Sequence, residues 1–338
     1  MTKSESQVNK GVAIVLMVFL HLFNQMQNID LCHPLIYIDN IPLVYILTSA
    51  CNPVPFFLIL GGYGLYKTWL KGDGTRWRRI LKIYIHWWLI LGVFVLLGHF
   101  ISGEPFNVDI LVLFENALGL LYTYNGEMWF LLPYVILSAL YPFIFKLMNK
   151  FKPLLVVLFT LLIYLTTSFT ISRYGSQYLY SHPLIYHLLL PFHLLFSFSL
   201  GAMAARTNFF DKLKVKFKNK RHIALISLLI LVFINLKFKY NFFYAFLFIS
   251  FFIQLTLSPL LTKILRKLGE HSMNIWMLHS WFCYYLFKDF IYSFYYPPLI
   301  FLVLLSLSYI GSIFINMAAI PIENLFMSKK VVREPPLI

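Results

Sequence analysis

The stretch Lys10-Gly-Val-Ala-Ile-Val-Leu-Met-Val-Phe-Leu-His21 begins with a cation and ends with a histidine, and only glycine and apolar residues separate the two. If the stretch is helical, steps of about 100° per residue return His21 to within about 20° of the face of Lys10, about 16 Å further along the axis. We expect Lys10 at a membrane surface and His21 inside the membrane, where an ionisable group is costly enough to suggest a function. The alternative is a histidine that only hydrogen-bonds a neighbouring helix.

The composition of the chain is that of a membrane protein. Of its 338 residues, 60% are hydrophobic and 12% are charged, a balance that no soluble domain needs. Apolar runs of about twenty residues, enough to cross a hydrocarbon core, recur about ten times. We predict an all-α polytopic membrane protein that forms a single domain over residues 1–338, with a short tail at 327–338. The predicted spans are at about 9–28, 41–66, 80–100, 128–148, 153–171, 183–204, 222–237, 241–261, 271–291 and 297–322.

The net charge of +15 is distributed as membrane topology requires, so we expect no nucleic-acid partner. Of the 28 lysines and arginines, 24 fall in alternate connections between the predicted spans, which places both termini in the cytoplasm. Residues 101–127 contain no cation and form the longest connection expected to face outward. Within it, residues 108–122 are too short and too acidic to span, and we predict an amphipathic or re-entrant helix there.

A second histidine occupies an equivalent place in the ninth predicted span, Leu268-Gly-Glu-His-Ser272-Met-Asn-Ile-Trp-Met-Leu-His279. His279 follows Lys267 by twelve residues, so both His21 and His279 should lie about 16–18 Å from the cytoplasmic surface. They could line one cavity. Ser272 shares a helix face with His279, and a capping or packing role is its alternative.

The third predicted span begins with Arg76-Trp-Arg78-Arg79-Ile-Leu-Lys82. Arg78, Arg79 and Lys82 are three to four residues apart and face one way, an arrangement suited to the phosphates of a cytosolic ligand. Two alternatives are that these cations only enforce topology or bind lipid headgroups.

Two further segments contain candidate binding residues. Asn52-Pro-Val-Pro-Phe-Phe-Leu-Ile-Leu-Gly61-Gly62-Tyr63-Gly64 places prolines and glycines in a span, where they indicate close helix packing or a kink that opens a cavity. Asn125-Gly-Glu127-Met-Trp129 pairs a carboxylate with an aromatic ring of the kind that stacks on sugars, or a Trp129 that only anchors the membrane interface.

Several classes of enzyme have no signature here. The chain lacks the zinc-protease motif His-Glu-x-x-His, the nucleophile motif Gly-x-Ser-x-Gly and any nucleotide-binding glycine pattern. The three cysteines are widely spaced and read as packing residues. We therefore expect no metal cofactor.

Five motifs in this order resemble the acyltransferase-3 family of integral membrane acyltransferases, many of which modify bacterial surface polysaccharides. Lys10-x10-His21 resembles its Arg-x10-His signature, and Pro55-Phe-Phe-Leu-Ile-Leu-Gly61-Gly62-Tyr63 resembles its Phe-Phe-x-x-Ser-Gly-Tyr/Phe stretch. Arg78-Arg79-Ile-Leu-Lys82, Trp129-Phe-Leu and Leu268-Gly-x-x-Ser272…His279 resemble its remaining motifs. This chain has Lys10 and Lys82 where the family has arginine, and Gly61 where it usually has serine. Lysine keeps the charge but loses the bidentate fork of arginine.

The resemblance implies a multi-pass protein of the bacterial cell membrane that transfers an acyl group, most often acetyl, from cytosolic acetyl-CoA to a hydroxyl of a saccharide or lipid-linked glycan. Lys10, Arg78, Arg79 and Lys82 would bind the donor's phosphates. His21 would act as general base or acyl relay, supported by His279 and Ser272, while Glu127, Trp129 and Tyr63 would contact the acceptor. The residues leave open a transporter or flippase of a glycan, with the histidines as a proton relay. Partners other than the acceptor and membrane lipids, and the oligomeric state, have no signature in the sequence.

Overall fold

The computed structural model describes residues 1–72, 74–102, 106, 109–218, 220–238 and 242–326. The predicted tail at 327–338 and part of the outward connection 101–127 lie outside the described residues. The chain is 80% helical, and the single sheet among the described residues is a two-stranded hairpin, β1 (Tyr37–Ile38) and β2 (Ile41–Pro42). The prediction of an all-α fold is confirmed.

The described residues contain seven helices that are long and apolar enough to cross a membrane, or eight if one bent pair is a single span. These seven are Lys3–Phe23, Leu43–Trp69, Arg76–Ile101, Gly126–Asn149, Pro153–Tyr174, Pro183–Arg206 and Pro297–Phe326. They coincide with seven of the predicted spans, so the protein is a multi-pass membrane protein. The total of ten spans, and the cytoplasmic placement of both termini, stay predictions.

The three other predicted spans are short or divided into several elements. Residues 222–237 belong to α11 (Arg221–Lys237), which follows the preceding helix at an angle of 119°. In residues 241–261, α12 (Tyr244–Phe252) has only nine residues, and Pro259 starts the next helix, α13 (Pro259–Glu270). Residues 271–291 are divided into α14 (Ser272–Ser280), a π-helical turn η3 (Trp281–Tyr285) and α15 (Lys288–Tyr292). Hydropathy averaged over about twenty residues does not resolve breaks of this length.

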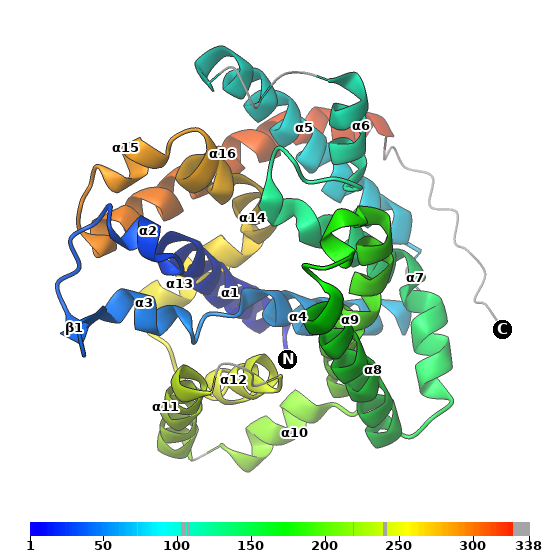
Figure 1. The fold of residues 1–338 in the computed structure, drawn as a ribbon. Helices are drawn as coiled ribbons and strands as arrows, with labels where there is room; N and C mark the ends of the chain where they lie inside the picture. Colours follow the sequence, from blue (N-terminus) through cyan, green and yellow to red (C-terminus); the bar gives the residue numbers. More distant parts are fainter. Residues whose placement is uncertain (73, 103–105, 107–108, 219, 239–241, 327–338) are drawn as a thin grey trace. The chain divides into compact units, whose positions relative to one another are not determined.

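The chain divides into two compact units, and the division falls inside the helices α4 (Pro53–Trp69) and α16 (Pro297–Phe326). Unit 1 comprises Met1–Phe57 and Phe209–Phe314, and unit 2 comprises Leu58–Asn208 and Ile315–Ile338. The elements are drawn in Figure 1. The expectation of a single domain stays a prediction.

Unit 1 is organised around α1 (Lys3–Phe23), which packs on α13 and α14. A β-carbon at Gly11 would overlap the Leu265 carbonyl, and one at Gly269 would overlap the Gln7 carbonyl. The two backbones touch at this crossing because both helices present glycine there. The close crossing brings α14 beside the second half of α1, where the core contains Val18, Leu22, Ile275, Cys283 and Leu304. The other elements of unit 1 are α2 (Met26–Ile29), the β1–β2 hairpin, α3 (Leu43–Thr48), α10 (Phe209–Lys216), α11, α12, η3, α15 and the first part of α16.

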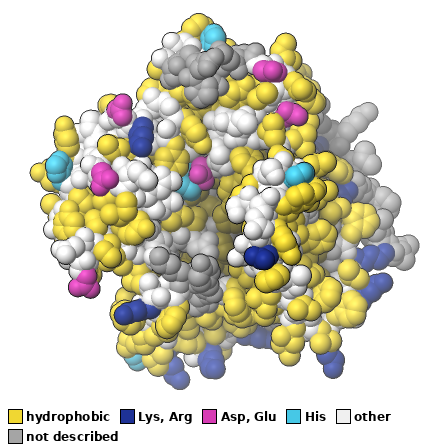
Figure 2. All heavy atoms as spheres, in the orientation of Figure 1, with side chains coloured by type: hydrophobic (Ala, Val, Ile, Leu, Met, Phe, Trp, Pro, Cys, Tyr) yellow, Lys and Arg dark blue, Asp and Glu magenta, His cyan; other side chains and the backbone are white. Residues whose placement is uncertain are grey.

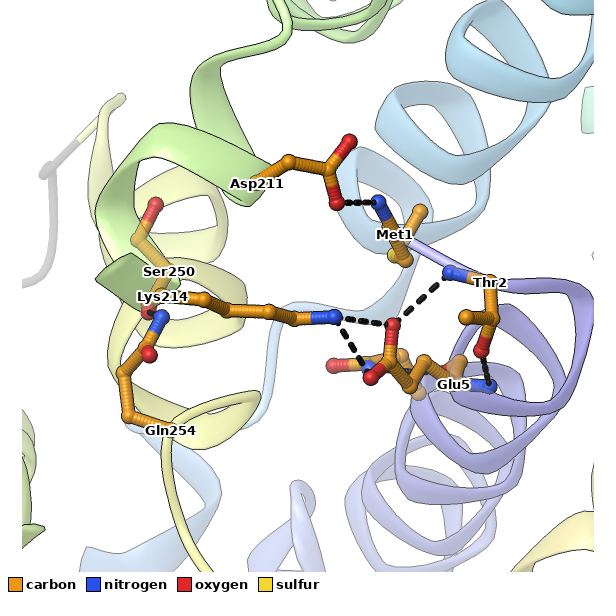
Figure 3. A network of polar contacts seen from close by, with 8 residues as sticks. Met1, Thr2, Glu5, Asp211, Lys214, Ser250 and Gln254 are labelled. Carbon is orange, nitrogen blue, oxygen red and sulfur yellow. Dashed lines mark hydrogen bonds and ion pairs between the residues drawn. The ribbon is translucent and has the colours of Figure 1, made fainter. Parts of the chain in front are cut away.

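The start of α1 is fixed by a polar network (Figure 3). Thr2 caps the helix by accepting from the Glu5 amide (3.2 Å), and the Glu5 carboxylate accepts from the Thr2 amide (2.7 Å), which makes a capping box. Lys214 of α10 donates to both oxygens of the same carboxylate, each at 2.6 Å. These contacts connect α10 to α1, the helix that contains His21.

Unit 2 contains another close crossing, between α4 and α9 (Pro183–Arg206). A β-carbon at Gly62 would overlap the Phe198 carbonyl, and one at Gly201 would overlap the Ile59 carbonyl. Packing therefore accounts for Gly62 in the glycine cluster of the second span. The other elements of unit 2 are α5 (Arg76–Ser102), α6 (Ile110–Leu118), η1 (Gly126–Phe130), α7 (Leu131–Asn149), α8 (Pro153–Tyr174), η2 (Leu179–Ser181) and the end of α16.

The helix α6 lies inside the stretch 108–122, where an amphipathic or re-entrant helix was expected. Asp109 caps its first turn, and Gly119 ends it in the left-handed conformation (φ 76°). The indole nitrogens of Trp87 and Trp88 on α5 donate to the carbonyls of Asn116 and Ala117, each at 2.9 Å. The two indoles of α5 thus bond carbonyls in the last turn of α6.

Hydrophobic side chains cover much of the visible surface (Figure 2). Large apolar residues on α8 are open in the structure, among them Leu154 (68%), Phe159 (64%) and Phe169 (67%). A soluble protein seldom exposes apolar side chains along a whole helix, whereas contact with lipid accounts for them.

Candidate active site

The structure places the imidazole rings of His21 and His279 side by side in unit 1, with ring centroids 4.9 Å apart. α1 is helical without interruption from Lys10 to His21, and His21 lies in its last turn. His279 lies near the end of α14 and is fully buried, whereas His21 is partly accessible. Two histidines separated by more than 250 residues therefore form one pair, in which His21 is the member that a substrate could reach.

Each ring has a defined hydrogen-bond environment. The Nδ1 atom of His279 lies 2.8 Å from the Trp276 carbonyl and 3.3 Å from the Ile275 carbonyl of its own helix. Its Nε2 atom has no hydrogen-bond partner among the described residues. The Nδ1 atom of His21 lies 3.3 Å from the hydroxyl of Tyr284. Backbone carbonyls thus orient the His279 ring through its Nδ1 atom, and the Tyr284 hydroxyl contacts the Nδ1 atom of His21.

Tyr284 is a site residue that the sequence motifs did not identify. It lies on the π-helical turn η3, and its ring is nearly perpendicular to the His21 ring (80°), with centroids 5.8 Å apart. No motif points to it, because Trp281-Phe-Cys-Tyr-Tyr285 offers several aromatic residues and nothing in that run selects one of them.

The remaining residues proposed for this part of the site are placed less closely together. Ser272 begins α14, two turns before His279, and its side chain makes no hydrogen bond to a described residue. Lys10 lies in the first half of α1, next to the Gly11 crossing. The roles of both residues stay predictions.

The basic cluster lies at the start of α5, in unit 2. The first turn of this helix contains Arg76, Arg78 and Arg79 and no acidic residue. Because a helix N-terminus already carries partial positive charge, cations there are unfavourable unless an anion binds. The electrostatics of this helix end therefore favour an anionic ligand.

The three arginines differ in their contacts. The Arg76 guanidinium donates to the Ala139 carbonyl on α7 (3.2 Å), and Arg79 donates to the Thr68 hydroxyl on α4 (3.0 Å). Arg78 makes no hydrogen bond or ion pair with a described residue. Arg78 is consequently the guanidinium of this cluster that is available to a ligand.

Lys82 has a partner that the sequence motifs did not indicate, the carboxylate of Glu323 on α16. The Lys82 amine lies 2.9 Å and 3.0 Å from the two carboxylate oxygens. The buried ring of His86, one turn further along α5, lies 2.7 Å from the same carboxylate. Lys82 thus links the end of α16 to α5. Because its amine is already paired with a carboxylate, it is less available for the expected role of phosphate ligand.

Replacing Glu323 with glutamine is expected to lower the free energy of unfolding by about 1–2 kcal/mol, because charged hydrogen bonds to Lys82 and His86 are lost together. Thermal unfolding of the purified protein in detergent measures this loss. Glu270→Gln is the matched control: Glu270 also pairs with two cations, Arg266 (3.8 Å) and Lys267 (3.1 Å), but all three side chains are exposed. Exposed pairs contribute little, so equal effects of the two substitutions would contradict the prediction.

The three residues proposed to contact the acceptor are in unit 2. Glu127 and Trp129 lie on η1, which Asn125 caps by accepting from the Glu127 amide (3.1 Å). Both side chains are partly accessible, and the Trp129 ring packs against Phe130. Tyr63 is buried (4% exposed) at the α4–α9 crossing, with the Lys67 amine 5.9 Å from its ring centroid. Glu127 and Trp129 are therefore better placed for a ligand than Tyr63.

Among the described residues, no group of three or more His, Cys, Asp and Glu side chains could hold a metal ion. Cys32, Cys51 and Cys283 are free thiols and are buried, as predicted for packing residues. Burial and the nearby Asp30 carboxylate raise the pKa of Cys32 to about 11, so this thiol is poorly nucleophilic at neutral pH.

The fold and this site define a multi-pass membrane protein with a histidine pair inside its helices and a basic helix end. Residues 7–317 match the family model Acyl_transf_3, described as an acyltransferase domain, and the chain belongs to the acyltransferase-3 family. It is therefore a membrane acyltransferase. Neither a curated protein nor a solved structure matches the chain.

Proposed function

We propose that this membrane acyltransferase transfers an acetyl group from cytosolic acetyl-CoA to a hydroxyl of a surface saccharide or lipid-linked glycan, with His21 as the general base. The observation that carries the proposal is the His21–His279 pair in an acyltransferase-3 chain. A neutral imidazole, whose ordinary pKa is about 6.5, suits proton abstraction near neutral pH.

In the proposed reaction, His21 removes the proton of the acceptor hydroxyl as the hydroxyl oxygen attacks the thioester carbonyl. The tetrahedral intermediate collapses by breaking the carbon–sulfur bond, and the departing thiolate takes the proton back from the imidazolium. The position of His21 in the last turn of α1 supports this role, because the negative end of a helix stabilises the imidazolium. Attack by His21 itself, to form a short-lived acyl-histidine, would use the same residues.

The basic end of α5 supports an acyl-CoA donor. Coenzyme A carries several phosphate charges, and Arg78 is positioned to meet an anion at a helix N-terminus that has no acidic residue. In the proposal, Arg78 and Arg79 bind the donor's phosphates, while Lys82 lies beside them in its pair with Glu323. Lys10 of α1 stays a candidate phosphate ligand through its match to the family's first motif.

In the proposal, the acceptor saccharide binds at the η1 segment, because the side chains there suit a sugar. Glu127 provides a carboxylate that can accept hydrogen bonds from sugar hydroxyls, and Trp129 provides a flat apolar face for a sugar ring. Tyr63 remains a candidate acceptor-binding residue only if its side chain moves out of its buried position when the ligand binds. The bacterial cell membrane and the O-acetyl specificity are parts of the same proposal.

The test is transfer of isotope-labelled acetyl from acetyl-CoA by the purified protein in lipid vesicles. We expect free coenzyme A and labelled glycan in equal amounts when surface polysaccharide from cells that lack the protein is supplied as acceptor. A transporter or flippase, the alternative function, would leave acetyl-CoA intact. Mass spectrometry of polysaccharide from cells with and without the protein then identifies the sugar that is modified.

A further inference from the structure

The π-helical turn η3 brings two residues of one helix to the same imidazole. His279 and Tyr284 are five residues apart, and in a regular α-helix they would point about 140° away from each other. In η3 the Leu286 amide donates to the Trp281 carbonyl (2.9 Å), a bond that spans five residues instead of four. Both rings consequently contact the His21 ring, with centroids at 4.9 Å and 5.8 Å. Such turns are frequent at functional sites.

The contacts of the Tyr284 hydroxyl determine which nitrogen of His21 carries a proton. The hydroxyl has a single proton, which it donates to the main-chain carbonyl of His21. The same oxygen lies 3.3 Å from His21 Nδ1. Since its proton is already used, the oxygen can only accept there, so Nδ1 must be the donor. In the neutral ring the lone pair is then on Nε2.

We propose that Tyr284 is a positioning residue that holds His21 in the Nδ1-protonated tautomer, with Nε2 as the nitrogen that accepts a proton. The catalytic consequence rests on the proposed function, in which Nε2 takes the proton of the acceptor hydroxyl. The assignment of the tautomer rests on the hydrogen bonds alone.

His279 complements this arrangement. Carbonyls accept only, so the Nδ1 atom of His279 also carries the proton, which it donates to Trp276 (2.8 Å). Its lone pair is on Nε2, which is buried and has no partner among the described residues. His21 and His279 are therefore in the same tautomer. When His21 takes up a proton, the neighbouring His279 ring still has a lone pair on Nε2.

Tyr292 offers a matched control for Tyr284. Its hydroxyl donates to the Leu22 carbonyl (2.7 Å), one residue beyond the carbonyl that Tyr284 bonds. Both tyrosines therefore fasten the end of α1 in the same way, and both lie C-terminal to α14 in unit 1. Tyr284 in addition contacts the His21 ring, so an effect that is purely structural should appear in the variants of both tyrosines.

The tautomer can be measured by nitrogen-15 magnetic resonance on histidine-labelled protein in lipid bilayers, at a pH where the ring is neutral. The His21 signals are identified by their loss in His21→Gln. We expect a protonated Nδ1 in the wild-type protein and in Tyr292→Phe, and a mixture of tautomers in Tyr284→Phe. A His21 tautomer that is unchanged in Tyr284→Phe would overturn the proposal.

The activity measurement is a separate arm. Tyr284→Phe is expected to lower kcat for acetyl transfer by about 10–100-fold, because a misplaced reacting group can cost about 10²-fold in rate. The KM for acetyl-CoA should stay within about twofold, and Tyr292→Phe should retain its kcat. If the tautomer changes in Tyr284→Phe but transfer does not depend on His21, the assignment of the base is wrong and that of the tautomer stands.

Discussion

Replacing His21 with asparagine is expected to lower the rate of acetyl transfer by at least about 100-fold, because a positioned general base contributes about 10²–10⁴-fold to such reactions. Asparagine tests the role of Nε2 more specifically than alanine does. Its amide nitrogen takes approximately the place of Nδ1 and can still donate to the Tyr284 hydroxyl, while no atom replaces Nε2. The rate of coenzyme A release in the presence of glycan measures the loss.

His193 supplies the control for the loss of a histidine inside the membrane. It lies in the α9 span of unit 2, and its Nδ1 atom is 3.3 Å from the Thr167 hydroxyl and 3.4 Å from the Ser168 hydroxyl of α8. It has the interhelical hydrogen bonds that a packing histidine would make. His193→Asn should therefore affect stability more than rate. A His21→Asn protein that unfolds normally and keeps its full transfer rate would remove His21 from the mechanism.

The charge and hydropathy of the chain were sufficient to predict where most membrane helices lie. The run from Lys10 to His21 is one uninterrupted helix, and seven of the predicted spans are long apolar helices. These features could be predicted because a span must satisfy its own backbone hydrogen bonds over a fixed length, which leaves a local signal in the sequence.

The π-helical turn and Tyr284 could not be predicted in this way. The bond from Leu286 to Trp281 shifts the register of the helix by one residue, and the apolar residues on either side conceal that shift from any periodicity. The pairing of His21 with His279 depends on the close crossing of α1 and α13, in which the backbones meet at Gly11 and Gly269. That crossing is set by tertiary packing rather than by the sequence around either histidine.

Glu323 and His86, by contrast, did leave a signal. His86 is an ionisable residue inside the predicted span 80–100, and Glu323 directly follows the last predicted span, 297–322. An ionisable residue in such a place is a reason to look for a partner or a function. The acid that pairs with Lys82 lies in the last helix, 241 residues later, and no local pattern connects the two residues.

Replacing Arg78 with alanine is expected to raise the KM for acetyl-CoA by about 10–100-fold, because a charged hydrogen bond to a phosphate contributes about 1.5–3 kcal/mol. The kcat should change little, since the phosphates do not take part in bond breaking. Arg78→Lys separates the two properties of the side chain. Lysine keeps the positive charge but cannot form the two parallel hydrogen bonds of a guanidinium. A KM between those of the wild type and Arg78→Ala would therefore indicate bidentate binding.

Arg79 requires a different control because its guanidinium already bonds the Thr68 hydroxyl (3.0 Å). Thr68→Val removes that hydroxyl and keeps the cation, so it isolates the structural part of any effect of Arg79→Ala. Acetyl-CoA that lacks the 3′-phosphate tests for contact with the ligand itself: the loss of affinity on removing this phosphate should disappear in the variant whose arginine binds it.

Two other roles for these arginines predict different results. If Arg78 only enforces topology, Arg78→Ala should leave KM unchanged, because 24 of the 28 cations already share that task. If it binds lipid headgroups, the effect should follow the anionic lipid content of the vesicle and not the phosphates of the donor. The position of Arg78 favours donor binding: the first turn of α5 has no acidic residue, and the three arginines there add to the positive end of the helix. That unfavourable accumulation of charge is relieved when an anion binds, and we therefore expect acetyl-CoA to raise the unfolding temperature of the wild-type protein more than that of Arg78→Ala.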